Sequence, residues 1–144
     1  MNANRFQGES VLVTGAASSV GRLIAERFAA EGGNVHICDV QEAALRETLA
    51  ANPDIRGTVG SVGKPDDVCR IFAEARTWLD PPTILVNTVG IGGPRAPIED
   101  VSIDDWLESF GVNVHGMFYC IREAVPAMKR AGRGVILNFS SGST

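Results

Sequence analysis

The stretch Thr14-Gly15-Ala16-Ala17-Ser18-Ser19-Val20-Gly21 is the most informative part of this chain. It follows the apolar run Val11-Leu12-Val13 and leads into a helical pattern that begins near Val20. A strand, a tight glycine turn and a helix N-terminus form a cradle for phosphate. The turn lets backbone N–H groups face the ligand, and the helix dipole adds about half a positive charge. The stretch therefore predicts a binding site for a dinucleotide, whose diphosphate needs both features.

Length, charge and hydropathy narrow the class of protein. The chain has 144 residues, which suits one domain with a real core. Its net charge of −4 argues against nucleic acid as the main partner, because phosphate backbones select a basic face. No apolar run approaches the ~18 residues of a membrane span, and the N-terminus lacks the apolar core of a signal peptide. We expect a cytoplasmic protein that binds neither nucleic acid nor membrane.

The cysteines and histidines do not indicate a metal. Cys38, Cys69 and Cys120 are scattered, which predicts reduced, buried thiols and not a disulfide framework. His36 and His115 are interpreted as packed or surface residues. No cluster of His, Cys and carboxylates has metal-ligand spacing, so we expect no metal site.

Short β-rich runs alternate with helical patterns along the chain. Strands are predicted at Ser10–Thr14, Asn34–Val40, Ile55–Val59, Thr83–Asn87 and Val135–Phe139. Helices are predicted at Val20–Glu31, Glu42–Ala51, Pro65–Leu79 and Asp104–Lys129. Such alternation gives right-handed parallel crossovers. We expect a single α/β domain over residues 1–144 with a doubly wound parallel sheet (a Rossmann fold) that stops after the fifth strand.

Asp39 stands at the end of the second predicted strand. A dinucleotide site needs an acidic residue there, to accept hydrogen bonds from the ribose hydroxyls. A carboxylate at this point repels a 2′-phosphate, and no Lys or Arg follows it or lies within the glycine turn. The sequence therefore favours NAD over NADP. The other interpretation is that Asp39 caps the helix that follows.

Three more motifs follow in register with the glycine turn. They are Asn87-Thr88-Val89-Gly90 after the fourth strand, Val112-Asn113-Val114-His115-Gly116-Met117-Phe118 in the long helix, and Asn138-Phe139-Ser140-Ser141 after the fifth strand. With these motifs the chain resembles, from Gly8 to Gly142, the short-chain dehydrogenase/reductase family, classical subtype. The resemblance implies a nicotinamide cofactor, and a small-molecule alcohol or carbonyl substrate interconverted by hydride transfer.

The resemblance also implies the site residues. Ser141 matches the catalytic serine that hydrogen-bonds the substrate oxygen. Asn113 matches an asparagine that helps hold a water in the family's proton relay. The implied cofactor-binding residues are Gly15, Ser18, Ser19, Val20, Gly21, Asp39, Val40, Val62, Asn87 and Gly90.

Several positions depart from the family pattern. Ser19 replaces the middle glycine of Thr-Gly-x-x-x-Gly-x-Gly, and its hydroxyl could donate to a phosphate or cap the helix. Thr88-Val89 replaces Asn-Ala. Ser61-Val62 replaces Asp-Val after the third strand, so that only the backbone contact of Val62 is expected to carry over.

The family's proton-transfer pair, Tyr-x-x-x-Lys, follows the catalytic serine and is missing here. The single tyrosine, Tyr119, lies within the long helix, has Glu123 four residues later and is expected to pack there. The resemblance thus implies the N-terminal portion of a dehydrogenase, inactive by itself. Either the sequence is part of a longer protein, which we favour, or the product stops here. The alternative function is a non-catalytic nucleotide-binding or regulatory fragment that acts through a partner chain.

The long helix carries an apolar stripe at spacings of three and four. The stripe consists of Leu107, Phe110, Val114, Phe118, Ile121, Val125 and Met128. In the family this helix packs on the sheet and joins a four-helix subunit interface, which implies a homo-oligomer (dimer or tetramer) for the full-length protein. The fifth strand is expected to form an uncovered apolar edge.

Overall fold

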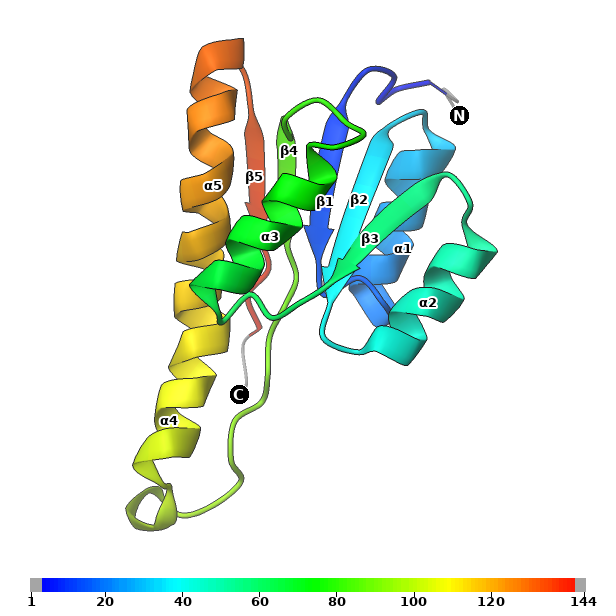
Figure 1. Ribbon diagram of the computed structural model, residues 1–144. Coiled ribbons are helices and arrows are strands. Elements are labelled where there is room, and N and C mark those ends of the chain that lie inside the picture. The colour runs from blue at the N-terminus through cyan, green and yellow to red at the C-terminus, as the bar shows by residue number, and fades with distance from the viewer. Residues whose placement is uncertain (1–3, 142–144) are drawn as a thin grey trace.

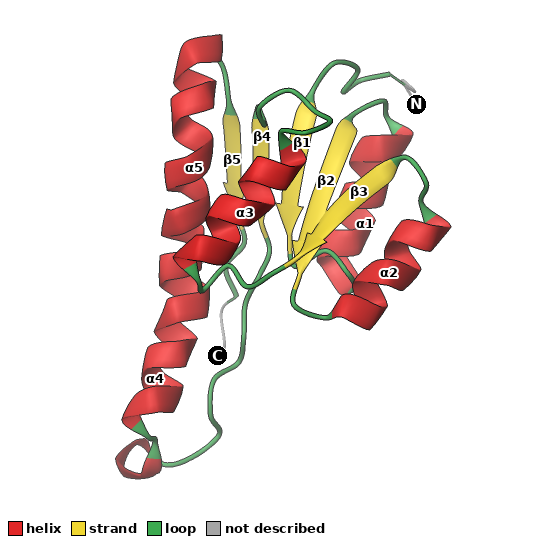
Figure 2. Cartoon of the chain, viewed as in Figure 1, coloured by secondary structure: helices red, strands yellow, loops and turns green. Residues whose placement is uncertain are grey.

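The computed structural model describes residues 4–141 and arranges them in three layers (Figure 1). A parallel sheet of five strands lies in the middle. Helices α1 (Ser19–Ala30) and α2 (Glu42–Ala51) cover one face. Helices α3 (Pro65–Ala75) and α5 (Gly116–Ala131) cover the other face, and α4 (Ile103–Phe110) extends beyond the carboxyl ends of the strands (Figure 2).

The strand order confirms the doubly wound sheet. The strands are β1 (Ser10–Thr14), β2 (Asn34–Asp39), β3 (Ile55–Val59), β4 (Ile84–Asn87) and β5 (Val135–Asn138). They are parallel and follow the order β3-β2-β1-β4-β5. The order reverses direction between β1 and β4. Ligands bind at such a switch point, outside the carboxyl ends of the strands.

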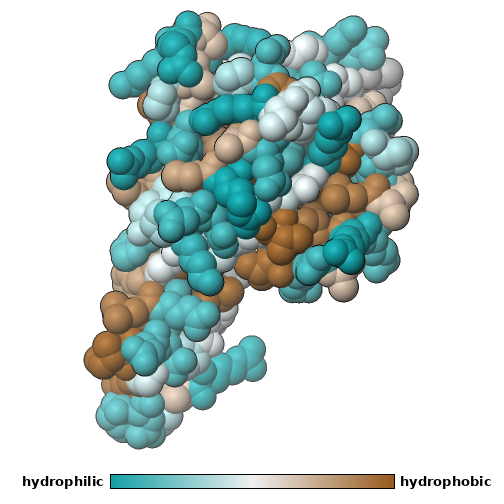
Figure 3. Space-filling view, in the orientation of Figure 1, coloured by the Kyte–Doolittle hydropathy of each residue, from teal (hydrophilic) through white to brown (hydrophobic). Residues whose placement is uncertain are grey.

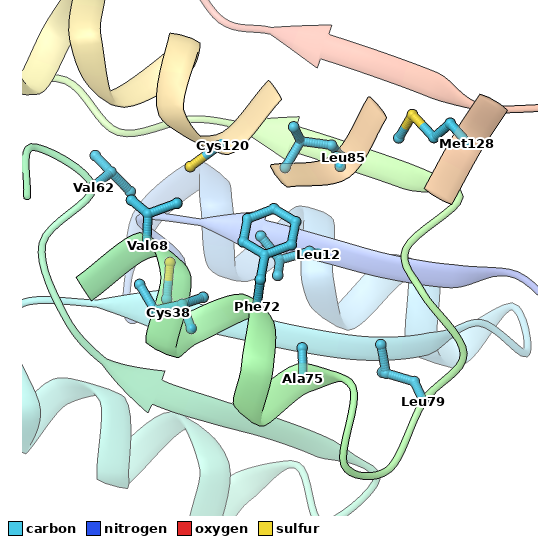
Figure 4. Packing of buried hydrophobic residues seen from close by; sticks show 12 residues of the cluster. Leu12, Cys38, Val62, Val68, Phe72, Ala75, Leu79, Leu85, Cys120 and Met128 are labelled. Carbon is cyan, nitrogen blue, oxygen red and sulfur yellow. The ribbon is translucent and has the colours of Figure 1, made fainter. Parts of the chain in front are cut away.

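Successive residues of β1 face opposite layers, because side chains alternate along a strand. Leu12 packs with Phe72 and Leu85 beneath α3 and α5 (Figure 4). Val11 and Val13 belong to the second cluster, beneath α1 and α2. Both faces of the central strands are therefore buried, which explains their uninterrupted apolar sequences.

The prediction of one continuous helix over Asp104–Lys129 is wrong in one respect. The helix is divided by a π-helical turn at Gly111–His115, and its α-helical parts are α4 and α5. The helix predicted to reach Leu79 ends as α3 at Ala75, although Leu79 remains buried in the following turn.

The buried face of α5 consists mainly of small residues. They are Gly116, Cys120, Ala124, Ala127 and Met128. Small side chains let the helix approach the sheet, and a Cβ on Gly116 would lie 2.7 Å from Val62 Cγ2. Four residues of the predicted stripe, Leu107, Phe110, Val114 and Phe118, are instead exposed. Apolar side chains accordingly gather on the surface over α4 (Figure 3).

The structure confirms some of the predictions about burial and corrects one. Cys38 and Cys120 are buried as expected, but Cys69 is exposed on α3, which corrects the prediction for that thiol. Val135, Leu137 and Phe139 are exposed, as expected of an apolar edge at β5. Within residues 4–141 no group of His, Cys and carboxylates has a metal-binding arrangement. In the same range, no helix is long and apolar enough to span a membrane.

Candidate functional site

A pocket of about 950 Å³ opens at the carboxyl ends of the strands. It lies at the switch point between β1 and β4 and extends past the ends of β2 and β3 on one side and β5 on the other. Eleven of the twelve predicted site residues line it: Gly15, Ser18, Ser19, Val20, Gly21, Asp39, Val40, Val62, Gly90, Asn113 and Ser141. The fold thus gathers residues 126 positions apart in sequence around one cavity.

The glycine turn has almost no spare volume. Gly15 adopts φ +63°, a left-handed conformation that glycine tolerates best. A Cβ on Gly21 would lie 2.3 Å from the Gly15 carbonyl oxygen and 2.7 Å from Thr88 Oγ1. The start of α1 can therefore approach the end of β1 only if residue 21 lacks a side chain.

Ser19 takes the glycine conformation without being glycine. Its φ of +51° is the single positive value among the described non-glycine residues. Ser18 is the N-cap of α1, and its side chain forms no capping hydrogen bond. Both hydroxyls are exposed in the pocket lining, beside a helix N-terminus that carries no acidic residue in its first turn. An anion suits this position.

Asp39 joins the end of β2 to the glycine turn. Its Oδ2 accepts a hydrogen bond from Ala17 N (3.1 Å), and its Oδ1 accepts one from Gln41 N (3.0 Å). The N-cap of α2 is Gln41, so Asp39 organises the approach to the helix without capping it. Among the described lining residues none is Lys or Arg, while Asp39 and Glu108 are acidic.

Asn113 lies in the π-helical turn, where its side chain clamps the loop after β4. Its Oδ1 accepts a hydrogen bond from Ile91 N (2.8 Å), and its Nδ2 donates to Ile91 O (2.9 Å). The side-chain amide is therefore used within the protein. The π-helical turn lies at the pocket, and such turns often occur at functional sites.

Asn87 is the one predicted site residue that lies outside the lining. It is buried at the end of β4, and its Nδ2 donates to Asn138 Oδ1 (2.8 Å). The bond joins β4 to β5 directly before the segment that carries Ser140 and Ser141. Ser141, the last described residue, is exposed at the pocket.

Sequence reasoning missed several lining residues. Glu108 and Val112 stand four apart on the helix, as do Asn113 and Met117. Since Asn113 was identified, helical spacing could have found Met117. Thr88 was noted only as a departure from the family, although it contacts the glycine turn directly.

Comparison with known proteins identifies the family. The family model described as short chain dehydrogenase matches residues 9–144. The chain belongs to the short-chain dehydrogenase family. The chain is similar to a 2-dehydro-3-deoxy-L-rhamnonate dehydrogenase (NAD(+)) of Sphingomonas sp. (strain SKA58), with 33% identity over 139 residues, 96% of this chain and 56% of that protein.

The chain is also similar to a second curated protein and to a solved structure. An NADPH-dependent aldehyde reductase-like protein of Arabidopsis thaliana is 32% identical, over 95% of this chain and 57% of that protein. The crystal structure of levodione reductase superposes with a TM-score of 0.87 at 27% identity, covering 95% of this chain and 55% of that one. The chain spans about half the length of these relatives. Their names include both NAD and NADPH, so similarity alone does not select the cofactor.

Proposed function

We propose that this chain forms the cofactor-binding part of an NAD(H)-dependent oxidoreductase that interconverts an alcohol and a carbonyl by hydride transfer. The observation that carries the proposal is a single pocket lined by the glycine turn, Asp39 and Ser141. A dinucleotide and a substrate oxygen can be held there together, at the switch point of the sheet.

Each part of the pocket has a separate task in this proposal. The N–H groups of the turn and of the first turn of α1 hold the diphosphate. Asp39 accepts hydrogen bonds from the ribose hydroxyls, and Ser141 hydrogen-bonds the substrate oxygen. The nicotinamide, when bound, gives or takes the hydride. Asn113 keeps the loop after β4 in place through Ile91.

Removal of the Asp39 carboxylate should relax the choice of cofactor. We expect Asp39→Ala to weaken NAD binding roughly tenfold, because it loses hydrogen bonds to a charged acceptor. We expect binding of NADP to weaken less or to improve, since the repulsion of the 2′-phosphate is gone. Titration calorimetry with both cofactors measures the ratio.

Asp39→Asn is the companion variant, because it removes the charge and keeps one of the two oxygen acceptors, so that either Ala17 N or Gln41 N loses its partner. It should shift the NAD/NADP ratio and lower the free energy of unfolding by about 1 kcal/mol. An unchanged ratio in both variants would refute the role of Asp39.

The reaction itself is tested by NADH binding and by NADH oxidation with a panel of carbonyl compounds. We expect this chain to bind NADH without turnover, because its 144 residues hold no tyrosine with a lysine four positions later. Absence of binding contradicts the proposal, and turnover contradicts the need for Tyr-x-x-x-Lys. A reading frame that continues past Thr144 without that pair supports the non-catalytic alternative.

We also propose that the full-length protein is a homo-oligomer. The support is the exposed apolar surface of α4, where Trp106, Leu107 and Phe110 lie between 40% and 58% exposed. An apolar surface of this kind is typical of a protein–protein contact. Sedimentation equilibrium should give a mass above that of one chain, and a monomer at all concentrations contradicts the proposal.

A further inference from the structure

The first peptide of the glycine turn, between Thr14 and Gly15, is held from the β4 side by Thr88. The Thr88 hydroxyl donates to the Thr14 carbonyl oxygen, and Thr88 N donates to Thr14 Oγ1 (3.2 Å). The side chain and the backbone of one residue thus hold the last residue of β1 at two points.

The next peptide of the turn is held from the β2 side. Ala16 N donates to the Cys38 carbonyl oxygen (3.2 Å). The start of the turn is therefore held on both sides, by Thr88 on the β4 side and by Cys38 on the β2 side.

The Thr88 hydroxyl also lies directly beneath the two glycines. Its Oγ1 is 3.3 Å from the position of a Cβ on Gly15 and 2.7 Å from that of a Cβ on Gly21. The absence of both Cβ atoms makes room for the hydroxyl. The glycine turn and the start of α1 therefore both pack against the side chain that directly follows β4.

We propose that Thr88 is a positioning residue, which fixes the glycine turn in the conformation that binds a nucleoside diphosphate. The inference rests on the proposed nucleotide binding. Thr88 acts through the backbone of residues 14 and 15, whose orientation decides where the following N–H groups point.

The experiment compares three variants by binding of adenosine diphosphate and of adenosine. Thr88→Val keeps the shape and removes the donor, and Thr88→Ser restores it. Thr83→Val is the matched control, because Thr83 precedes β4 and its hydroxyl donates to Glu9 (2.6 Å) at the opposite end of the same strand pair. Titration calorimetry measures the affinity for ADP. NMR titration, which is suited to weak binding, measures the affinity for adenosine.

We expect Thr88→Val to weaken ADP binding roughly tenfold and adenosine binding less than about twofold, since adenosine has no phosphate. Thr88→Ser should recover ADP affinity to within about twofold. Thr83→Val should lower the urea midpoint but leave ADP affinity unchanged. If Thr88→Val does not fold, Thr88→Ala leaves the same carbonyl without its donor and is measured in its place.

Two results separate the possible failures. If the unmodified chain does not bind ADP, the proposed nucleotide site is wrong. If it binds ADP and Thr88→Val binds equally well, or loses ADP and adenosine to the same extent, the positioning role of Thr88 is wrong while the nucleotide site stands.

Discussion

Replacement of Gly21 by alanine should weaken ADP binding at least about 100-fold and lower the free energy of unfolding by about 3 kcal/mol. The added Cβ would lie 2.3 Å from the Gly15 carbonyl oxygen and 3.0 Å from Ala16 Cα. Both neighbours are backbone atoms, so neither can rotate away as a flexible side chain would. The start of α1 must therefore move off the end of β1, and the N–H donors of the cradle move with it.

Gly111→Ala is the matched control for this effect. A Cβ on Gly111 meets nothing within 4 Å, its φ is not positive, and it lies outside the pocket lining. We expect Gly111→Ala to bind ADP normally and to unfold within about 1 kcal/mol of the parent. Urea unfolding and calorimetry measure both quantities. ADP binding by Gly21→Ala within tenfold of the parent would contradict the tight contact between β1 and α1.

The sheet could be predicted well because its signals are local. Each predicted strand agrees with the structure to within one residue at either end. Buried parallel strands are continuous apolar runs, and the glycine and proline residues between them end each element. The alternation of strands and helices predicted a doubly wound parallel sheet, and the structure supplies the strand order β3-β2-β1-β4-β5.

The helix that carries Asn113 could not be predicted in the same way. Its π-helical turn coincides with the clamp between Asn113 and Ile91, residues 22 positions apart. A periodic pattern carries no information about such a contact. The π-helical turn also inserts an extra residue into the helical repeat, so a stripe counted at spacings of three and four leaves the buried face. Phe118, which follows the turn, is accordingly exposed, whereas Phe110 lies in α4, a helix in which no residue is buried.

Within the candidate site, the motif located the residues but not what each does. Asn87 was placed at the right strand end, yet its amide is used by Asn138 inside the sheet. Ser19 was recognised as a substituted glycine, and only the structure shows that it adopts φ +51°. Thr88 faces the turn because β1 and β4 are neighbours, which is a property of the sheet and not of the local sequence.

Acid should destabilise this protein through His36, which is buried in β2. Trp78 Nε1 donates to His36 Nδ1 (3.1 Å), so the neutral ring carries its proton on Nε2 and donates to Thr58 Oγ1 (3.0 Å). Burial lowers the pKa of His36 to about 4; the nearby Glu74 carboxylate raises it and Arg56 lowers it. A second proton would go to Nδ1, where it faces the Trp78 N–H.

The direction of the pH effect on stability follows from proton binding to His36 in the folded and unfolded states. The unfolded chain binds a proton on this histidine with a pKa near 6.5, and the folded protein does so only near pH 4. The His36 contribution is therefore complete above pH 6.5, falls as the pH is lowered to 4 and changes no further below that. The difference between the two pKa values corresponds to about 3 kcal/mol.

Urea unfolding between pH 7.5 and pH 4 can isolate this contribution by comparison with His36→Gln. Glutamine offers an oxygen to Trp78 and an N–H to Thr58 but does not titrate. Carboxylates with a lowered pKa, such as those of Glu9 and Asp67, also weaken the fold in acid. The variant keeps these carboxylates and His115, so their effect cancels when the two proteins are compared. We expect the variant to start less stable at pH 7.5 and to lose about 3 kcal/mol less on acidification. Equal losses in the two proteins would mean that His36 gains its proton in the folded state as readily as in the unfolded chain, which its burial and its two hydrogen bonds oppose.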